Sequence, residues 1–393
     1  MSDELRPVSQ LQGVSSSFDG SRLTLARQLA GLRKVELAKL IEMTPASVAA
    51  WENGTKFPAK TAIARLSMKL QVPPRFFAAQ SATGLAPAAP HFRSLRSTTQ
   101  LAQDQAFAYG RLVGDIASVI ERTIEFPERN LPANPVDSGV PSSDGPERAA
   151  QALRVHFKLP VGPVQHLVRL AERAGVLVVF SAPKTASIDA FSMEASGRPL
   201  IVLNPAKDDY YRQRFDVAHE LGHLMMHVDA EPGGRIAEDQ AQRFASEFLM
   251  PASQIRDYLP KTTTGRGWAT LRALKEHWGV SMQALLFRAR TLGVMSDVTY
   301  RNAMIRISSL GWRRAEPGNV SVVEMPSLIP KAVEVLESAG VSAADLIHGP
   351  GLPLAVFDLI ASRTPNQVAS SQQADGESGL LSALLRSEQT SKE

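Results

Sequence analysis

Two histidines and a glutamate in the stretch FDVAHELGHLMMH, residues 215–227, have the types and spacing that hold a metal ion. His219 and His223 are four residues apart, so on a helix both imidazoles lie on one face and can bind one cation. Glu220 lies beside them, where its carboxylate can take a proton from a metal-bound water. We expect Zn²⁺, because it accepts neutral imidazole and carboxylate ligands and the chain has no cysteine.

A catalytic zinc site needs a third protein ligand and an open position for water. His227 continues the same helix face, but it stands a full turn beyond His223, and three successive turns of a straight helix do not easily reach one ion. The longer motif with a further glycine and histidine is absent, since Met226 and Asp229 occupy those places. The remaining candidates are two carboxylates on the following helix, Glu238 and Glu247.

Hydrophobic periodicity and turn residues predict the elements that must position the motif. We expect helices at 147–157, 164–174 and 237–248. Strands are predicted at 175–180, 188–194 and 198–204, with Ser196-Gly197 as the turn between the last two. The strand RPLIVLN at 198–204 could present a sheet edge along which a substrate backbone pairs. After Gly265 the chain is predicted to be helical again to about residue 310.

Basic side chains are concentrated near the N-terminus. Residues 18–80 hold ten Lys/Arg and four Asp/Glu, a local net charge of +6 in a chain whose total is +4. Thr44 is a good N-cap with Pro45 at the first helical position, and the helix stops at Asn53-Gly54. Two short helices joined by a tight turn in a basic module favour a DNA-binding helix-turn-helix over a helical protein-interaction module, which is the alternative.

The stretch LARQLAGLRKVELAKLIEMTPASVAAWENGTKFP, residues 25–58, resembles the XRE/Cro-type helix-turn-helix family. The resemblance implies that Arg33 and Lys34 face phosphates and that the second helix of the motif faces bases. The base-facing side chains are nearly all small, so we expect low sequence specificity, or specificity through methyl contacts and DNA shape. Such readers usually bind DNA as dimers. The predicted DNA contacts are Arg33, Lys34, Pro45, Ala46, Ser47, Ala50, Asn53 and Lys56.

The histidine motif and the helix after it resemble the ImmA/IrrE-type metallopeptidase family. The matching stretches are RQRFDVAHELGHLMMH at 212–227 and AEDQAQRFASEFLMP at 237–251. This resemblance implies that Glu238 is the third zinc ligand, that Glu247 is solvated or supports the site from outside, and that His227 packs or supports a ligand. It also implies a zincin-like fold and a protein or peptide substrate such as a transcriptional repressor. Flanking segments resemble larger members in which an XRE-type domain precedes the peptidase.

These features together predict a multi-domain, mainly α protein with an α+β part that contains a small sheet. The expected units are a helix-turn-helix domain at 18–80, a helical connector and linker at 81–145, a zincin-like metallopeptidase domain at 146–262, a helical C-terminal region at 263–362 and a flexible tail at 363–393. The helical segment from 266 to 362 is a candidate cap on the active site, because it directly follows the metal helices.

The predicted function is that of a DNA-binding transcriptional regulator whose zinc endopeptidase domain cleaves a protein partner, with Glu220 as the catalytic base. The absence of cysteine and of any long apolar run indicates a cytoplasmic protein without a membrane role. The alternative is a non-proteolytic regulator, antitoxin-like or responding to stress or phage, whose peptidase-like domain only senses a metal or ligand. The two functions differ in what Glu220 does.

Overall fold

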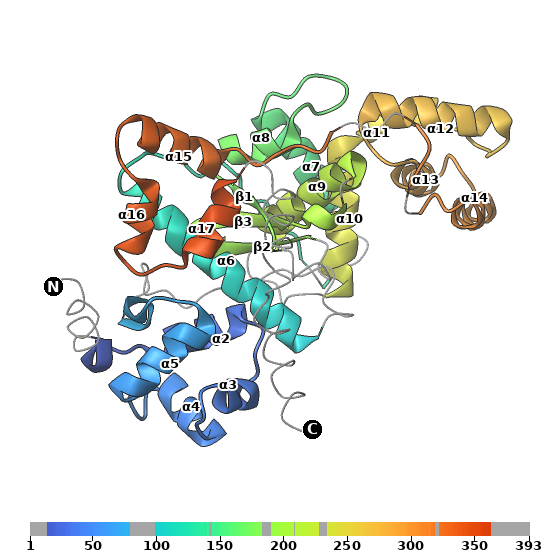
Figure 1. Cartoon of the computed structure of the whole chain (residues 1–393). Coiled ribbons are helices and arrows are strands. Elements are labelled where there is room, and N and C mark those ends of the chain that lie inside the picture. Colours follow the sequence, from blue (N-terminus) through green and yellow to red (C-terminus); the bar gives the residue numbers. More distant parts are fainter. Residues whose placement is uncertain are drawn as a thin grey trace.

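The chain is mainly helical and carries one three-stranded sheet in its described part, so the predicted fold class is confirmed (Figure 1). Residues 81–98 of the predicted connector and the predicted tail at 363–393 lie outside the described residues. Within the described ranges, no helix is both long enough and apolar enough to cross a membrane. The structure is a computed structural model that describes residues 14–78, 99–137, 139–140, 144–182, 190–207, 209–227, 234–313, 315–318 and 322–362.

The N-terminal module packs short helices around a shared apolar core. Its helix-turn-helix forms where the sequence predicts it. The helix at residues 45–52 begins at Thr44, whose hydroxyl accepts a hydrogen bond from the Ser47 backbone N–H at 3.1 Å. It ends before Gly54, which adopts the left-handed conformation (φ 69°). The elements are α2 (Gly20–Leu29), α3 (Lys34–Leu40), α4 (Pro45–Glu52), α5 (Lys60–Leu70) and the 3₁₀ turn η1 (Pro74–Ala78).

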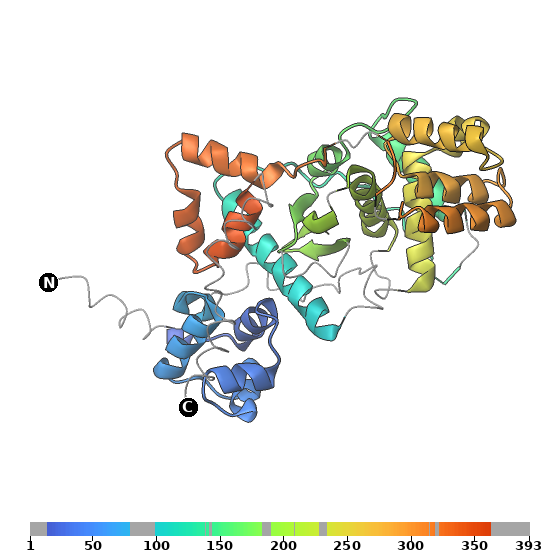
Figure 2. The same cartoon turned by 45° about the vertical axis from the view of Figure 1, so that its right-hand side comes forward.

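The long helix α6 (Gln100–Glu121) lies between the N-terminal module and the sheet (Figures 1 and 2). Gly110 and Gly114 let α6 approach the sheet closely. A Cβ on Gly114, for example, would lie 2.8 Å from the Cβ of Ala195. On the other side, the buried Arg22 of α2 forms an ion pair with Asp115 of α6 at 2.6 Å. The helix-turn-helix module is therefore joined to the rest of the chain through α6.

The sheet consists of β1 (Leu177–Phe180), β2 (Ala190–Ala195) and β3 (Arg198–Leu203) in the order β1-β3-β2. β3 runs parallel to β1 and antiparallel to β2, to which the two-residue turn Ser196-Gly197 joins it. Both turn residues have positive φ, as a tight hairpin of this kind requires. Because β3 is paired on both sides, the expectation that RPLIVLN forms a sheet edge is wrong.

Alternation along the strands divides the apolar residues between two cores. Val179 and Val202 face one core, which also contains α6 and the last helices of the described chain. Val178 and Ile201 face the other, which contains the helices around the histidine motif. That second core is built from α7 (Gly145–His156), α8 (Leu167–Arg173), α9 (Tyr210–Met226), α10 (Arg235–Leu249) and the short α11 (Ala252–Ile255).

The helical region after Gly265 divides into two groups on opposite sides of the sheet (Figures 1 and 2). The first group, α12 (Gly265–Trp278), α13 (Met282–Thr291) and α14 (Asp297–Ser309), extends the core that surrounds α9 and α10. The second packs against α6 on the far face of the sheet and consists of α15 (Leu328–Ser338), α16 (Ala343–His348) and α17 (Leu354–Ala361). Of the predicted cap, only the first group is placed near the motif.

Near the end of the predicted connector and linker, the Pro-containing stretch PANPV at residues 132–136 packs against the end of α9. The backbone N–H groups of Asn134 and Val136 donate to the carbonyls of Met225 and Met226 at 2.9 and 3.1 Å. The last carbonyls of a helix have no partner within the helix, so these bonds satisfy them. This part of the stretch is thus a fixed support for the helix that carries the histidines.

Candidate metal centre

α9 and α10 can bring their side chains together because a glycine separates the two histidines of the motif. A Cβ on Gly222 would lie 2.8 Å from the ring atom Cδ1 of Phe244, a fully buried residue of α10. A larger residue at this position would push α10 away from α9. The close packing places Glu238, in the first turn of α10, opposite the histidines.

The three predicted ligands lie side by side. The Nε2 atoms of His219 and His223 are 3.1 Å apart. The Glu238 carboxylate oxygens lie 3.4 Å from His219 Nε2 and 3.5 Å from His223 Nε2. Ligand atoms about 2.1 Å from a tetrahedral zinc are about 3.4 Å from one another, so these spacings fit one shared ion. The histidines are buried and the Glu238 side chain is 20 % exposed, which leaves one side accessible.

The polar state of Glu238 also fits a metal. Both of its carboxylate oxygens are buried without a hydrogen-bond donor among the described residues. A desolvated carboxylate needs a compensating charge. Burial alone would raise the pKa of Glu238, but positive charge at His219 and His223 lowers it well below its usual range. A cation held by the two neutral imidazoles would supply the same charge and keep the group ionised. Two imidazoles and an ionised carboxylate are ligands that zinc accepts.

His227 forms a hydrogen bond with Nδ1 of His223, the ring nitrogen that does not face Glu238. Gln240 Nε2 donates to the carbonyls of Asp137 and Val140, so its Oε1 accepts from His227 Nε2 at 2.8 Å. His227 Nδ1 is then free of its proton and accepts from His223 Nδ1 at 3.0 Å. These hydrogen bonds place the proton of His223 on Nδ1 and its lone pair on Nε2, the atom that faces His219 and Glu238. Burial, with His223 beside it, lowers the pKa of His227 to about 4, which keeps the ring neutral.

Replacing His227 with Ala should weaken zinc binding by about 10- to 100-fold, the usual effect of losing a partner that orients a metal-binding histidine. Zinc affinity is measured by competition with a fluorescent chelator. His277→Ala, which changes an exposed histidine of α12, is the matched control and should leave the affinity unaltered. Unchanged affinity in His227→Ala would remove the supporting role, and a loss as deep as in His219→Ala would make His227 a ligand.

Glu220 is a fully buried residue of α9, and its side chain contacts the sheet. Its Oε2 accepts a hydrogen bond from Ser192 Oγ of β2 at 2.8 Å, while Oε1 has no hydrogen-bond partner among the described residues. Burial, with smaller contributions from the charges of Glu238 and Asp216, raises the pKa of Glu220 to about 7. The carboxylate is therefore poised to exchange a proton near neutral pH. Ser192 was not among the predicted site residues, although it is a polar residue on a buried strand face.

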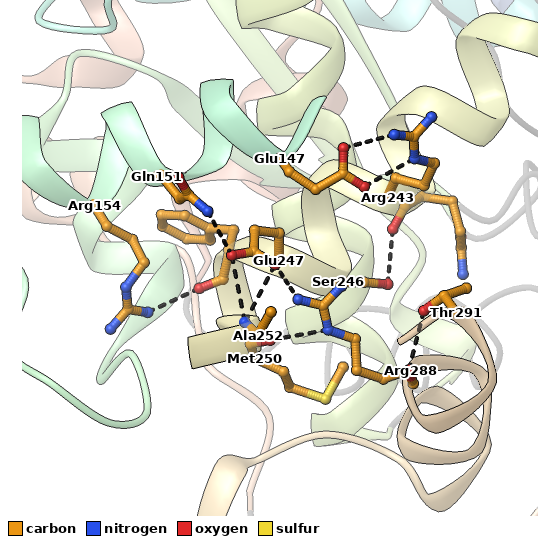
Figure 3. A network of polar contacts seen from close by, with 12 residues as sticks. Glu147, Gln151, Arg154, Arg243, Ser246, Glu247, Met250, Ala252, Arg288 and Thr291 are labelled. Atoms are coloured by element: carbon orange, nitrogen blue, oxygen red, sulfur yellow. Dashed lines mark hydrogen bonds and ion pairs between the residues drawn. The ribbon is translucent and has the colours of Figure 1, made fainter. Parts of the chain in front are cut away.

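Glu247, the other carboxylate considered as a ligand, is bound elsewhere (Figure 3). It is 2 % exposed and forms an ion pair with Arg288 of α13, and it accepts a hydrogen bond from Gln151 Nε2 of α7 at 3.0 Å. It stands nine residues after Glu238, about 13 Å further along α10. Of the two roles expected for Glu247, solvation is wrong, because the carboxylate is buried and joins α7, α10 and α13 through Gln151 and Arg288.

Arg288→Ala should destabilise the fold by about 3 to 5 kcal/mol, because it leaves the Glu247 carboxylate buried without its cation. Arg290→Ala, also on α13, breaks the exposed pair with Asp297 of α14 and should cost at most about 1 kcal/mol. Urea unfolding followed by tryptophan fluorescence compares the two variants. Equal midpoints would show that the buried pair contributes no more than the exposed one.

The predicted DNA contacts lie at the start of α3, on α4 and in the turn that follows α4. Arg33, Pro45, Ala46, Asn53 and Lys56 are exposed, whereas Lys34, Ser47 and Ala50 are partly buried. Glu52 fixes this helix in place: it accepts from Arg27 Nε at 2.5 Å and lies 3.2 Å from Lys34 Nζ. The positive charge of Lys34 is consequently shared with Glu52, while Arg33 and Lys56 are exposed.

Comparison with known families gives the same two-part description. Residues 171–290 match the family model of the IrrE N-terminal-like domain, a peptidase family, and residues 23–77 match a helix-turn-helix model. The first match covers the sheet, α9, α10, α12 and nearly all of α13. No curated protein matches the chain. The chain thus joins an XRE-type helix-turn-helix domain to an ImmA/IrrE-like, peptidase-like domain, and the predicted fusion is confirmed.

Proposed function

We propose that the protein is a DNA-binding transcriptional regulator whose IrrE N-terminal-like domain is a zinc-dependent endopeptidase. The observation that carries this proposal is the meeting of His219, His223 and Glu238 at spacings suited to one tetrahedral ion, with the Glu220 carboxylate beside them. The peptidase domain suggests a protein substrate, and a transcriptional repressor is the kind of partner that the family resemblance implies.

His219, His223 and Glu238 would hold the ion, which when bound polarises a peptide carbonyl and acidifies a water molecule. Glu220 takes the proton of the attacking water on the oxygen that carries no hydrogen bond, and later passes it to the leaving amine. Ser192 holds the other oxygen and so fixes the direction of the carboxylate. Burial favours the protonated form, which retains the proton until the amine leaves.

The substrate backbone is best placed along β2. This strand pairs with β3 on one side and has no second neighbour among the described residues. It also carries Ser192, whose hydroxyl binds Glu220, so a peptide added to its open edge would run beside the catalytic carboxylate. Main-chain hydrogen bonds of this kind hold an extended peptide without selecting its side chains.

The proposal is tested by adding the zinc-loaded protein to an extract of its own cells and identifying new N-termini by mass spectrometry. We expect a small set of cleaved proteins that disappears with chelator and returns when zinc is restored. Zinc bound at one ion per chain without any cleavage product would favour the non-proteolytic regulator instead. The same experiment names the substrate if there is one.

DNA binding is expected to rest on phosphate contacts. Arg33→Ala and Lys56→Ala should each weaken DNA binding about equally across unrelated sequences and lower the slope of log affinity against log salt by about 1. Fluorescence anisotropy over a salt series measures both effects. Lys331→Ala on α15, outside the helix-turn-helix, is the control. An unchanged slope in both variants would remove these residues from the interface, and a concentration series would show whether the protein binds as a dimer.

A further inference from the structure

On α9 and α10, the two helices that carry the proposed ligands, further residues lie on the same helix face as the ligands. Asp216 stands three residues before His219 on α9, about 4.5 Å along the axis, and lies on the same face. Gln242 stands four residues after Glu238 on α10 and likewise shares its face. Asp216 is close enough to Glu220 for its charge to act on that carboxylate. The region beside Asp216 and Gln242 therefore adjoins the catalytic groups.

A cavity of about 350 Å³ opens in this region, and Asp216 and Gln242 form part of its wall. Its opposite wall comes from the helices that follow the metal site: Ala284 and Phe287 on α13, and Tyr300 on α14. Ala284, Phe287 and Tyr300 are all only partly buried, so part of each side chain stays exposed at the cavity. The helices after Gly265 thus complete a pocket next to the metal site.

The lining indicates which chemical group fits. Phe215, Phe287, Tyr300 and Met304 supply large apolar surfaces, and the small Ala284 leaves room between them. Both charge signs are present, since Arg212 and Asp216 share the α9 wall, so neither a cationic nor an anionic group is favoured overall. The remaining lining residues, Gln242, Ser281 and Gln283, are polar, so the cavity has mixed polarity. The three aromatic rings in its wall, which pack favourably against another ring, are the feature that points to an aromatic group.

We propose that this cavity binds an aromatic side chain of the substrate, from a residue adjoining the bond that is cut. The inference rests on the proposed peptidase function and adds the substrate class to it. Backbone pairing along β2 would hold the peptide in register, and the cavity would select where along the sequence cleavage occurs. The pocket also gives α13 and α14 a role in specificity.

The test uses the zinc-loaded full chain and two hydroxamates, because a hydroxamate binds zinc without any need for cleavage. Acetohydroxamate reports the metal alone, and the hydroxamate of 3-phenylpropionic acid adds a phenyl group that can enter the cavity. Isothermal titration calorimetry should show about 10- to 100-fold tighter binding of the phenyl compound. Ala284→Trp fills the cavity and should abolish this preference while leaving acetohydroxamate binding unchanged.

Ala269→Trp, at an exposed position on α12, is the control and should keep the full preference. If Ala284→Trp does not fold, Tyr300→Ala removes one wall instead and should reduce the preference several-fold. Wild-type binding of acetohydroxamate without any phenyl preference, or a preference that survives both pocket variants, overturns the aromatic pocket alone. Failure of the zinc-treated wild type to bind acetohydroxamate overturns the metal centre itself, and this inference with it.

Discussion

Replacing Glu220 with Gln should lower peptide cleavage by about 10²- to 10⁴-fold and leave the bound zinc unchanged. The amide keeps the shape of the carboxylate and its place beside Ser192, but it cannot accept the proton of the attacking water. Cleavage of a substrate identified in the extract experiment is measured for zinc-loaded wild type and variant at equal metal content. Glu276→Gln, at an exposed glutamate of α12, is the matched control.

The same variant separates the two candidate functions. A regulator that only senses a metal should show the same DNA binding and the same transcriptional output with Glu220 or Gln at this position. A regulator that cleaves its partner should lose its transcriptional effect in Glu220→Gln while still binding DNA. Full cleavage by the variant would instead assign the proton transfer to another group.

Glu238→Ala should reduce zinc affinity by far more than the roughly 100-fold that loss of a supporting residue costs. The substitution removes one of three ligands and leaves two imidazoles, which alone hold zinc weakly. Chelator competition should place Glu238→Ala close to His219→Ala. Zinc kept by Glu238→Ala but lost by His219→Ala would contradict the ligand set.

Neither alternative third ligand fits the structure as well. His227 contacts His223 through Nδ1, on the opposite edge of the ring from the atom that faces Glu238. Glu247 is engaged by Arg288 at the other end of α10. A zinc site that survives the loss of Glu238 would require one of these two networks to rearrange.

The parts of the site that the sequence predicted are those set by local spacing. His219, Glu220 and His223 belong to one helix, so their separation alone places them together, and the glycine turn at Ser196-Gly197 predicted the hairpin of β2 and β3. Glu238 is on a different helix, and its assignment came from family resemblance because spacing within α9 could not choose among three candidates. The close approach at Gly222 is what makes that assignment geometrically possible.

The features that the sequence did not predict depend on contacts between distant segments. The pairing of β1 with β3 made β3 a central strand, and nothing within RPLIVLN indicates a second neighbour. Ser192 contacts Glu220 only because β2 packs against α9. Glu247 is buried because its partner Arg288 comes from α13, about forty residues further along the chain. Likewise, the Pro-rich stretch has the composition of a linker, but its backbone N–H groups find unpaired carbonyls at the end of α9.

X-ray absorption at the zinc edge of the zinc-loaded protein tests the central claim most directly, because it reports both the presence and the type of ligands. The account predicts one zinc per chain, four-coordinate, with two imidazoles and oxygen donors and no sulfur. A spectrum with three imidazoles would contradict the assignment of Glu238 and bring His227 to the metal. Failure to take up zinc at all would leave His219 and His223 as buried core residues of a DNA-binding protein.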